Sequence, residues 1–433
     1  MIDFTGAVIG FFVMLGLMFC GIHIATTMLT ISVIGAAIYL GPATIMAFGT
    51  NLWAVMNDFL LTAIPLFVLL GELLLRSGIT KRMYDGLADW LSVLPGGLLH
   101  TNIGACGLFA AVSGSSVATA ATIGTVALPE FKNRQYNERL VLGTIAAGAT
   151  LGILIPPSVN LIIYGALTNT SIGQLFVAGI VPGLLLLSLF MMIVVVACVL
   201  HPAFAGKREP RAPLRDRLHR LRALIPPLAI FAVVMGGIYF GWATPTEAAA
   251  IGVVMAALLV AANGKLTIST LHEAFASTVK TTALILLIIV AAFYLNFIVG
   301  ILGVPQAMTN FVAQVGVDAM TTIWLLVLFY LILGCFLETL SMMVGTIPVV
   351  FPIVLHLGID PVWFGIFLVL MMEMALITPP VGMNLYVVQG VRGGGPVSDL
   401  FYGVTPFILM LFLLVCIIIA YPPLVTWLPG LLY

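Results

Sequence analysis

Two pairs of adjacent prolines lie inside long apolar stretches, and each pair is followed by an asparagine. The first stretch, "GILIPPSVNLIIYG" (152–165), contains Asn160, and the second, "ALITPPVGMNLYVV" (375–388), contains Asn384. A proline inside a helix removes a backbone hydrogen bond and costs about 3 kcal/mol. Both stretches are therefore predicted to be helices that break near their middle.

The backbone carbonyls freed by these breaks could bind a cation. A carbonyl that faces lipid costs several kcal/mol, so breaks at membrane depth persist where protein, water or a bound ion satisfies them. The side-chain oxygen of Asn160 would lie beside the carbonyls near Pro156, and Thr378 would add a hydroxyl near Pro379 and Asn384. Hard cations such as Na⁺ suit oxygen ligands of this kind. The alternative is a proline-kinked helix packed against its neighbours, which explains one break more easily than two matching ones.

A cluster of serines could bind an anion at a similar depth. The stretch "AVSGSSVATAATIGT" (111–125) places Ser113, Ser115 and Ser116 together in an apolar run. If the chain turned there, serine hydroxyls and free amides at a helix N-terminus could hold an anion without a buried Lys or Arg. The alternative is a helix interface made of small residues.

Carboxylates also lie inside apolar stretches. "GCFLETLSMMVGTIPVVFP" (334–352) brings Glu338 and Thr339 to a depth that corresponds to the serine cluster. An ionisable residue inside a membrane is a functional candidate, and for Glu338 a place near a cation and a hydrogen-bonded tie both remain open. Glu72 and Glu373 lie in other apolar spans and are predicted to tie helices together.

The composition points to a membrane protein. Of the 433 residues 62% are hydrophobic and 7% are charged, which excludes an ordinary water-soluble domain. Each crossing needs about 20 apolar residues, and the runs are continuous rather than alternating, so the spans are helical. The predicted fold class is an all-α polytopic membrane protein. The net charge of zero gives no sign of nucleic acid binding, and the absence of an HExxH motif and of a nucleophile–base pair gives none of an enzyme.

The positive charges predict an orientation. Ten spans, together with two shorter apolar stretches at 98–129 and 320–352, leave residues 43–52 and 263–280 outside the membrane. If the N-terminus is outside, every Lys and Arg falls on the inner side, in segments 76–97, 130–139, 201–222, 263–280 and 391–398. Such asymmetry follows the positive-inside rule. It requires both shorter stretches to return to the side that they entered from, as re-entrant hairpins or paired spans.

An internal repeat relates the two halves. Pro129 precedes Pro156 by 27 residues and Pro352 precedes Pro379 by the same distance, so the halves are offset by 223 positions. Five crossings per half is an odd number, so the second half is inverted, an arrangement typical of secondary transporters.

The segments 77–95 and 301–318 resemble amphipathic helices on the two membrane faces. The first predicted repeat covers residues 1–205, with its hairpin at about 98–129 and its broken helix at about 138–168. A basic linker follows at 206–222. The second repeat covers residues 223–433, with its hairpin at about 320–352 and its broken helix at about 361–390.

Four motifs resemble a known family: "SGSSVATAATIG", "GILIPPSVNLIIYG", "ATPTEAAAIGVV" and "LITPPVGMNLYVV". They are similar to the large membrane subunit of tripartite ATP-independent periplasmic (TRAP) transporters, over nearly the whole chain. The resemblance implies a Na⁺-driven elevator transporter in the bacterial inner membrane, with both termini periplasmic. It also implies a small four-helix membrane subunit, separate because this chain starts directly with the large subunit, and a periplasmic binding protein. That protein would deliver a small carboxylate such as a C4-dicarboxylate or sialic acid.

The resemblance also implies where ions and substrate bind. A first Na⁺ site would lie between the first hairpin tip and the first break, and a second between the 338–345 tip and the second break. Glu338 stands where many relatives are expected to have an aspartate. The first site would comprise Ser113, Gly114, Ser116, Pro156 and Asn160, and the second Glu338, Gly345, Thr378, Pro379, Gly382 and Asn384. Substrate would lie between the tips, bound by Ser113, Ser115, Ser116, Thr339, Asn160 and Asn384.

Two other functions remain open from the sequence. A stand-alone Na⁺- or H⁺-coupled dicarboxylate or citrate carrier would use similar hairpins without a binding protein. An ion channel could also contain hairpins, but it would have a continuous pore and would not saturate with substrate.

Overall fold

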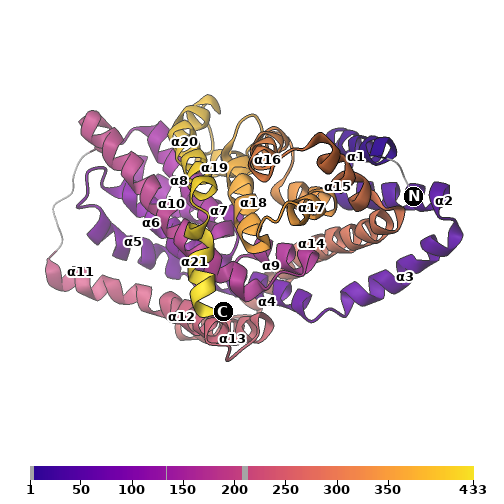
Figure 1. Cartoon of the computed structure of the whole chain (residues 1–433). Helices are drawn as coiled ribbons and strands as arrows, with labels where there is room; N and C mark the ends of the chain where they lie inside the picture. The colour runs from indigo at the N-terminus through magenta and orange to yellow at the C-terminus, as the bar shows by residue number, and fades with distance from the viewer. Residues whose placement is uncertain (1–3, 133, 207–212) are drawn as a thin grey trace.

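The computed structural model describes residues 4–132, 134–206 and 213–433. Within these residues the chain is helical, with 21 α-helices, three short 3₁₀ turns and no strand (Figure 1). Seven helices are long and apolar enough to cross a bilayer, and two bent helix pairs raise the number to nine. These findings confirm the predicted class of an all-α polytopic membrane protein. The longest span is α14 (Ile268–Leu302), with 35 residues.

Two segments that lie between the predicted spans are helical in the structure. α3 (Pro42–Met56) covers residues 43–52 and meets the next helical segment, which ends with α4 (Ala63–Arg76), at a bend of 62°. Polar side chains of α3 bond within the helix, as Asn51 does to the Ala47 carbonyl at 2.9 Å. Residues 263–280 are helical from Ile268 onward, since Thr267 caps α14 by accepting from the Thr270 amide.

The first hairpin and broken helix consist of four helices. The hairpin comprises α6 (Leu98–Ser113) and α7 (Ser116–Lys132), which are separated at Gly114 and Ser115. Gly114 ends α6 with φ +60°, a left-handed conformation that favours glycine. The broken helix comprises α8 (Glu138–Leu154) and α9 (Val159–Thr168), with the proline pair between them.

The second half contains four helices of nearly the same bounds, shifted by 223 positions. They are α16 (Ala319–Gly334), α17 (Thr339–His356), α18 (Pro361–Ile377) and α19 (Met383–Arg392). α8 and α18 both have 17 residues, and α9 and α19 both have 10. Each break also contains one cis peptide bond, between the two prolines. The division of the whole chain into repeats at residues 206–222 stays a prediction.

Two amphipathic helices flank the hairpins as expected: α5 (Ile79–Leu91) and α15 (Val304–Val315). The described part of the basic linker forms α11 (Leu214–Leu221), while residues 207–212 lie outside the described residues. α11 docks on α5, because Arg220 pairs with Asp89 at 3.3 Å and the Arg217 guanidinium lies over the Trp90 ring.

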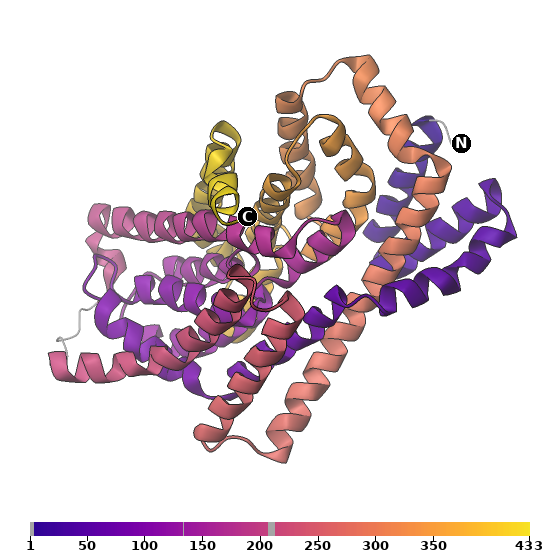
Figure 2. The ribbon, with the colours of Figure 1, turned by 60° about the horizontal axis from the view of Figure 1, so that its bottom comes forward.

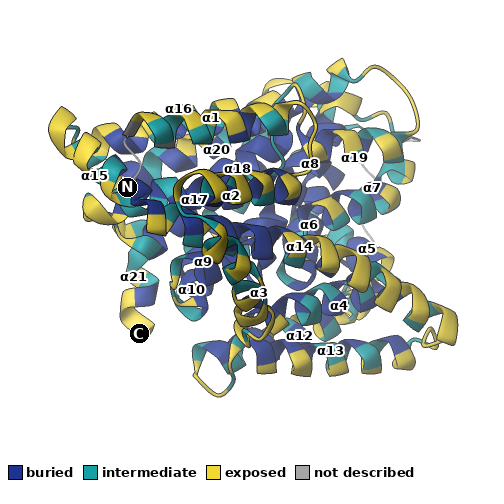
Figure 3. Ribbon diagram, turned by 90° about the vertical axis from the view of Figure 1, so that its right-hand side faces the viewer, coloured by how far each residue is buried: buried dark blue, intermediate teal, exposed yellow. Residues whose placement is uncertain are grey.

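The helices that lead into the two breaks, α8 and α18, form the centre of the molecule. Every residue of α18 from Val362 to Ile377 is buried, and so are nearly all residues of α8, whereas exposed residues gather on the outer helices (Figure 3). Figure 2 shows the long α14 crossing the molecule beside the N-terminal helices. The remaining helices are α1 (Phe4–Phe19), α2 (Ile24–Tyr39), α10 (Ile172–Leu200), α12 (Ile225–Tyr239), α13 (Pro245–Ala262), α20 (Ser398–Ala420) and α21 (Pro423–Leu432).

Glu72 ties two of the outer helices together, as predicted. Its carboxylate accepts a 2.7 Å hydrogen bond from Ser277 on α14 and pairs with Arg76 on its own helix, α4. Arg76 also lies 3.6 Å from Glu273 on α14. This polar cluster fixes α4 against α14.

Candidate functional site

The first break leaves a backbone carbonyl without its helical donor. The amide of Ile155 makes the last helical bond of this segment, to the Leu151 carbonyl at 2.9 Å. The next two residues are prolines without an N–H, so the carbonyls of Gly152 and Ile153 receive no backbone donor from them. The Ser158 hydroxyl donates to Ile153 at 2.5 Å. The carbonyl of Gly152 therefore has lost its helical donor at a buried position.

The first hairpin tip contacts this break closely. A Cβ added at Gly114 would lie 2.7 Å from the Pro157 carbonyl oxygen, and one added at Gly152 would lie 3.0 Å from the Ser116 amide nitrogen. Such distances are tolerated only because both residues are glycines. Ser113 lies within the same tip, where its hydroxyl is 3.1 Å from that of Thr119. The structure thus brings the first hairpin tip together with the Pro156–Pro157 break.

Asn160 begins α9 just after this break. It is 6% exposed, and its Nδ2 has no hydrogen-bond partner among the described residues. Buried polar groups in proteins are nearly always paired, so an unpaired one marks a place where a ligand, ion or water can bind. The free NH₂ group fits a carboxylate, and a half rotation of the amide would present its oxygen to a cation.

Asn384 belongs to the second break, yet it bonds to the first hairpin. Its Nδ2 donates to the Ser116 hydroxyl at 2.7 Å and to the Ala146 carbonyl at 3.2 Å, and its Oδ1 lies 3.0 Å from the same hydroxyl. Likewise α19 packs against α7, and α9 packs against α17. Each broken helix therefore also contacts the hairpin of the other half. Sequence reasoning missed this connection, since the two residues are 268 positions apart and no local pattern links them.

The second hairpin tip is organised by Glu338. Its carboxylate caps α17 by accepting from the Ser341 amide at 3.1 Å, and it also accepts from the Thr339 hydroxyl at 3.1 Å. A carboxylate at this place satisfies free amides and complements the positive end of the helix dipole. Of the two roles left open for Glu338, the structure shows the hydrogen-bonded tie, made within its own tip.

The second break repeats the chemistry of the first but is more open. The amide and hydroxyl of Thr378 both donate to the Met374 carbonyl, at 2.9 and 2.6 Å. Pro379 and the proline after it supply no N–H, so two carbonyls of α18 lose their donors. Gly382 has φ +48° and is buried. Pro380 is exposed, whereas both prolines of the first break are buried.

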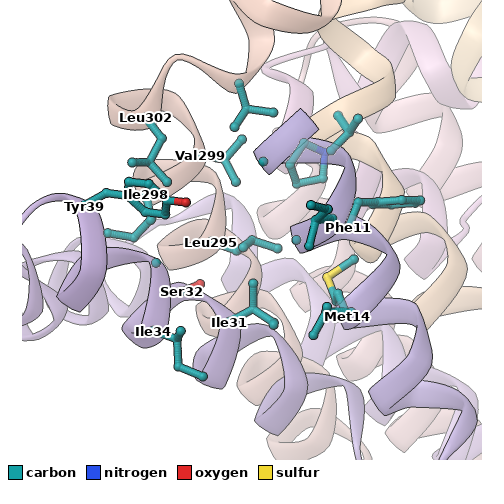
Figure 4. A pocket seen from close by; sticks show the side chains of 18 of the residues that line it. Phe11, Met14, Ile31, Ser32, Ile34, Tyr39, Leu295, Ile298, Val299 and Leu302 are labelled. Atoms are coloured by element: carbon teal, nitrogen blue, oxygen red, sulfur yellow. The ribbon is translucent and has the colours of Figure 1, made fainter. Parts of the chain in front are cut away.

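Gly345 is placed apart from these groups. It lies seven residues beyond Glu338 on α17, about 10 Å along the axis, where a Cβ would face Met14 and Ile24 at 3.7 Å. There it lines an apolar pocket between α1, α2, α14 and α17 (Figure 4). The pocket lining contains no charged residue, and its side-chain hydroxyls come from Ser32 and Tyr39. The structure does not bring Gly345 to the other predicted ligands.

The prediction for Glu373 is wrong. This residue of α18 is 0% exposed, and neither of its carboxylate oxygens has a hydrogen-bond partner in the part of the chain that the structure describes. It therefore ties no helices together, unlike Glu72.

The donor set as a whole suits a hard cation better than a transition metal. No cluster of three or more His, Cys, Asp or Glu side chains forms among residues 4–132, 134–206 and 213–433. The groups near the breaks are backbone carbonyls, hydroxyls, amides and one carboxylate. Oxygen donors of this kind suit hard cations.

Comparison with known proteins agrees with this architecture. Residues 11–424 match the family described as "Tripartite ATP-independent periplasmic transporter, DctM component". The C4-dicarboxylate TRAP transporter large permease protein DctM of Pseudomonas aeruginosa is 35% identical, with 89% of each chain covered. The sialic acid TRAP transporter large permease protein SiaM of Vibrio cholerae is 32% identical, covering 99% of this chain and 98% of that protein. The crystal structure of the YdaH transporter of Alcanivorax borkumensis shares the fold, with a TM-score of 0.57 at 15% identity, covering 84% of this chain and 87% of that one. The chain therefore belongs to the DctM component family of tripartite ATP-independent periplasmic transporters.

Proposed function

We propose that this chain is the permease subunit of a Na⁺-coupled secondary transporter that takes up an organic acid across the bacterial inner membrane. The observation that carries the proposal is the contact between the first hairpin tip and the first break, where Gly114 meets the Pro157 carbonyl. Carbonyls freed by paired prolines and facing a polar tip inside a membrane protein are suited to bind a coupling ion.

Two cation positions follow from the two breaks. At the first, carbonyls near Pro156 would act with Ser113, Gly114 and Ser116, and with the Asn160 amide oxygen. At the second, carbonyls near Pro379 and Gly382 would act with Thr378, Asn384 and Glu338. The Ser116–Asn384 hydrogen bonds connect the two positions, so an ion bound at one would affect the geometry of the other.

The substrate would lie between the tips. Its carboxylate would meet the free NH₂ of Asn160, the hydroxyls of Ser115 and Thr339, and the N-terminal amides of the hairpin helices, which favour negative charge. Because α7, α9, α17 and α19 contribute no Lys or Arg near the breaks, a bound Na⁺ would supply the compensating positive charge. Relatives that carry a C4-dicarboxylate and sialic acid indicate the class of substrate.

Alternating access would move the hairpins and broken helices as a unit. The Glu72 cluster fixes α4 to α14, so these helices would form part of the static scaffold. Two partners would complete the transporter: a small four-helix membrane subunit, and a periplasmic binding protein that delivers the substrate.

Reconstitution into liposomes tests the proposal. The chain would be combined with its two partners, and uptake of labelled succinate and of sialic acid would be measured with and without an inward Na⁺ gradient. Uptake should require both the gradient and the binding protein. Asn160→Ala, and Pro379→Ala, which restores an amide donor within the break, should depress Na⁺-dependent uptake. Asn51→Ala, the same change as Asn160→Ala on the outer helix α3, should not.

Equal uptake with and without Na⁺ would refute the coupling. Uptake that needs no binding protein would favour a stand-alone carrier, and flux that does not saturate would favour a channel. Wild-type Na⁺ dependence in both break variants would remove the proposed ion positions.

A further inference from the structure

We propose that Glu373, a fully buried and unpaired carboxyl group within the central helix α18, binds and releases a proton during each transport cycle. The inference rests on the proposed transport function and adds a second coupling ion to it. Its basis is the contrast between the burial of Glu373 and the absence of any partner.

Glu373 lies deep within the membrane. α18 begins at Pro361, and Asp360 caps it by accepting from the Trp363 amide at 2.7 Å. Twelve residues separate Pro361 from Glu373, a distance of about 18 Å along the helix axis. The hydrocarbon core of a bilayer is about 30 Å thick, so with the charged cap Asp360 at the membrane surface Glu373 would lie near the middle of the core.

Nothing in the described chain compensates a charge at this position. Val362 to Ile377 are all buried, so protein covers Glu373 on every side. Neither oxygen accepts a hydrogen bond, and no Lys, Arg or His of the described residues forms an ion pair with it. Burying an unpaired carboxylate in a medium of low dielectric is so costly that the group takes up a proton instead. In this conformation Glu373 therefore holds a proton.

The titratable groups on the neighbouring helices are engaged elsewhere. α18 packs against α8, α9, α10, α16, α17, α19, α20 and α21. Tyr164 donates to the Pro361 carbonyl and Tyr330 bonds to Thr346, while Glu338 caps its own helix. The four charged residues near one end of these helices bond to one another: Glu138, Arg139, Arg392 and Asp399. No described contact joins Glu373 to the other titratable groups on these helices, which are Cys198, His356, Tyr386, Tyr402 and Cys416.

The fold does not need a carboxyl group here. The equivalent position of α8, 223 residues earlier, is Thr150, which is also fully buried. Its hydroxyl is satisfied within its own helix by donating to the Ala147 carbonyl at 2.8 Å. The equivalent helix α8, which has the same length, ends at the same kind of break and is equally buried, thus has at this position a neutral side chain that forms its hydrogen bond within the helix. The carboxyl group of Glu373 is an addition that packing does not explain, and an ionisable residue at membrane depth marks an ion or proton pathway.

Glu373 lies on α18, which belongs to the broken helices that move with the hairpins in the proposed function, and this place predicts a proton cycle. The protonated, neutral form can be carried through the membrane with the hairpins, whereas the ionised form needs water or a cation nearby. Water stabilises the ionised carboxylate far more than the neutral acid, so a state that offers water to Glu373 favours release of the proton. A proton taken up from outside and released inside would enter with each substrate.

Proton movement in the reconstituted complete transporter tests the inference. Vesicles would contain a trapped pH-sensitive dye, the membrane potential would be clamped, and a Na⁺ gradient would drive succinate or sialic acid, whichever the wild type transports. The lumen of wild-type vesicles should acidify with uptake, and a pH gradient of one unit, acid outside, should raise substrate accumulation by up to about tenfold. E373Q should retain Na⁺-driven uptake, with neither acidification nor a response to the pH gradient. E72Q changes a membrane carboxylate that is already paired, and it should keep both.

The outcomes separate this inference from the proposed function. Na⁺-driven uptake without proton movement in the wild type would overturn the proton site alone, while absence of Na⁺-driven uptake would overturn the transport proposal. Proton movement that persists in E373Q would also overturn the site. If E373Q does not transport, infrared difference spectra of the purified complex decide: the band of a titrating protonated carboxylic acid should be missing in E373Q, and an unchanged band would refute the assignment.

Discussion

Replacing Gly114 by alanine should weaken Na⁺ binding without preventing folding. Gly114 turns the first hairpin tip with φ +60°, and its Cα faces the Pro157 carbonyl so closely that a Cβ would lie 2.7 Å from the oxygen. Ordinary van der Waals contact begins near 3.4 Å. The tip must therefore retreat by about 0.7 Å from the break in the alanine variant, since 3.4 exceeds 2.7 by that amount.

The size of the effect has two parts. An alanine in the left-handed region costs about 1–2 kcal/mol wherever it occurs, and this part lowers the stability of the fold. The displacement of the tip adds a loss that is specific to the ion. If it removes one oxygen contact with Na⁺, the loss is about 1.5–3 kcal/mol, the scale of polar contacts to charged groups. Na⁺ affinity should then fall by about tenfold to a hundredfold.

The assay is the Na⁺-dependent rise in melting temperature of the purified chain, because an ion that binds only the folded state stabilises it by an amount that grows with the logarithm of the Na⁺ concentration relative to its dissociation constant. Gly241→Ala is the matched control: Gly241 has φ +68°, but a Cβ there would meet nothing within 4 Å. Both variants should melt earlier without Na⁺, and only Gly114→Ala should need a higher Na⁺ concentration than the wild type for the same rise in melting temperature. A folded Gly114→Ala protein with the wild-type rise at each Na⁺ concentration, or an equal loss in the control, would refute the reasoning.

Three further predictions concern packing and charge. A double-mutant cycle of Ser116→Ala and Asn384→Ala, measured by thermal unfolding, should give a coupling free energy of about 0.6 and at most about 1.7 kcal/mol. Additive effects of the two changes would show that the hydrogen bonds between these side chains contribute nothing to stability. Gly143→Ala would place a Cβ against the Gly403 carbonyl oxygen of α20 and should destabilise the protein by about 1–3 kcal/mol, whereas Gly390→Ala, which meets open space, should not lower the melting temperature. Burial raises the pKa of Asp85 on the amphipathic helix α5 above its ordinary value of 3.8. The contribution of Asp85 to the stability of the fold is therefore most favourable below pH 3.8, and it is lost as the pH rises through the raised pKa. Asp85→Asn should therefore stabilise the protein at pH 7, and this gain should shrink on acidification; a gain independent of pH would contradict the assignment.

The sequence predicted the broken elements because prolines and glycines leave strong local signals. The two proline pairs marked both breaks, and the run around Ser113 marked a turn that the structure centres on Gly114. Local bonding explains how the polar residues of α3 fit a helix, since Thr50 and Asn51 both donate to the Ala47 carbonyl one turn earlier.

Contacts between the halves could not be predicted in the same way. Asn384 reaches Ser116 through the packing of α19 on α7, which no spacing within either half reveals. The resemblance places Gly345 along the chain and the apolar run gives the depth of Glu373, but neither gives a direction, and a helix presents a new direction every 100°. Depth therefore fixes how far a residue lies within the membrane but not which helix it faces.

Direct binding of radioactive Na⁺ to the purified chain tests the central claim, that carbonyls released at both breaks bind cations together with the hairpin tips. Equilibrium dialysis should find about two bound ions per chain at saturation, and Pro379→Ala, which changes only the second break, should reduce the number toward one. No saturable Na⁺ binding to a folded chain, or the same two ions bound in that variant, would contradict it.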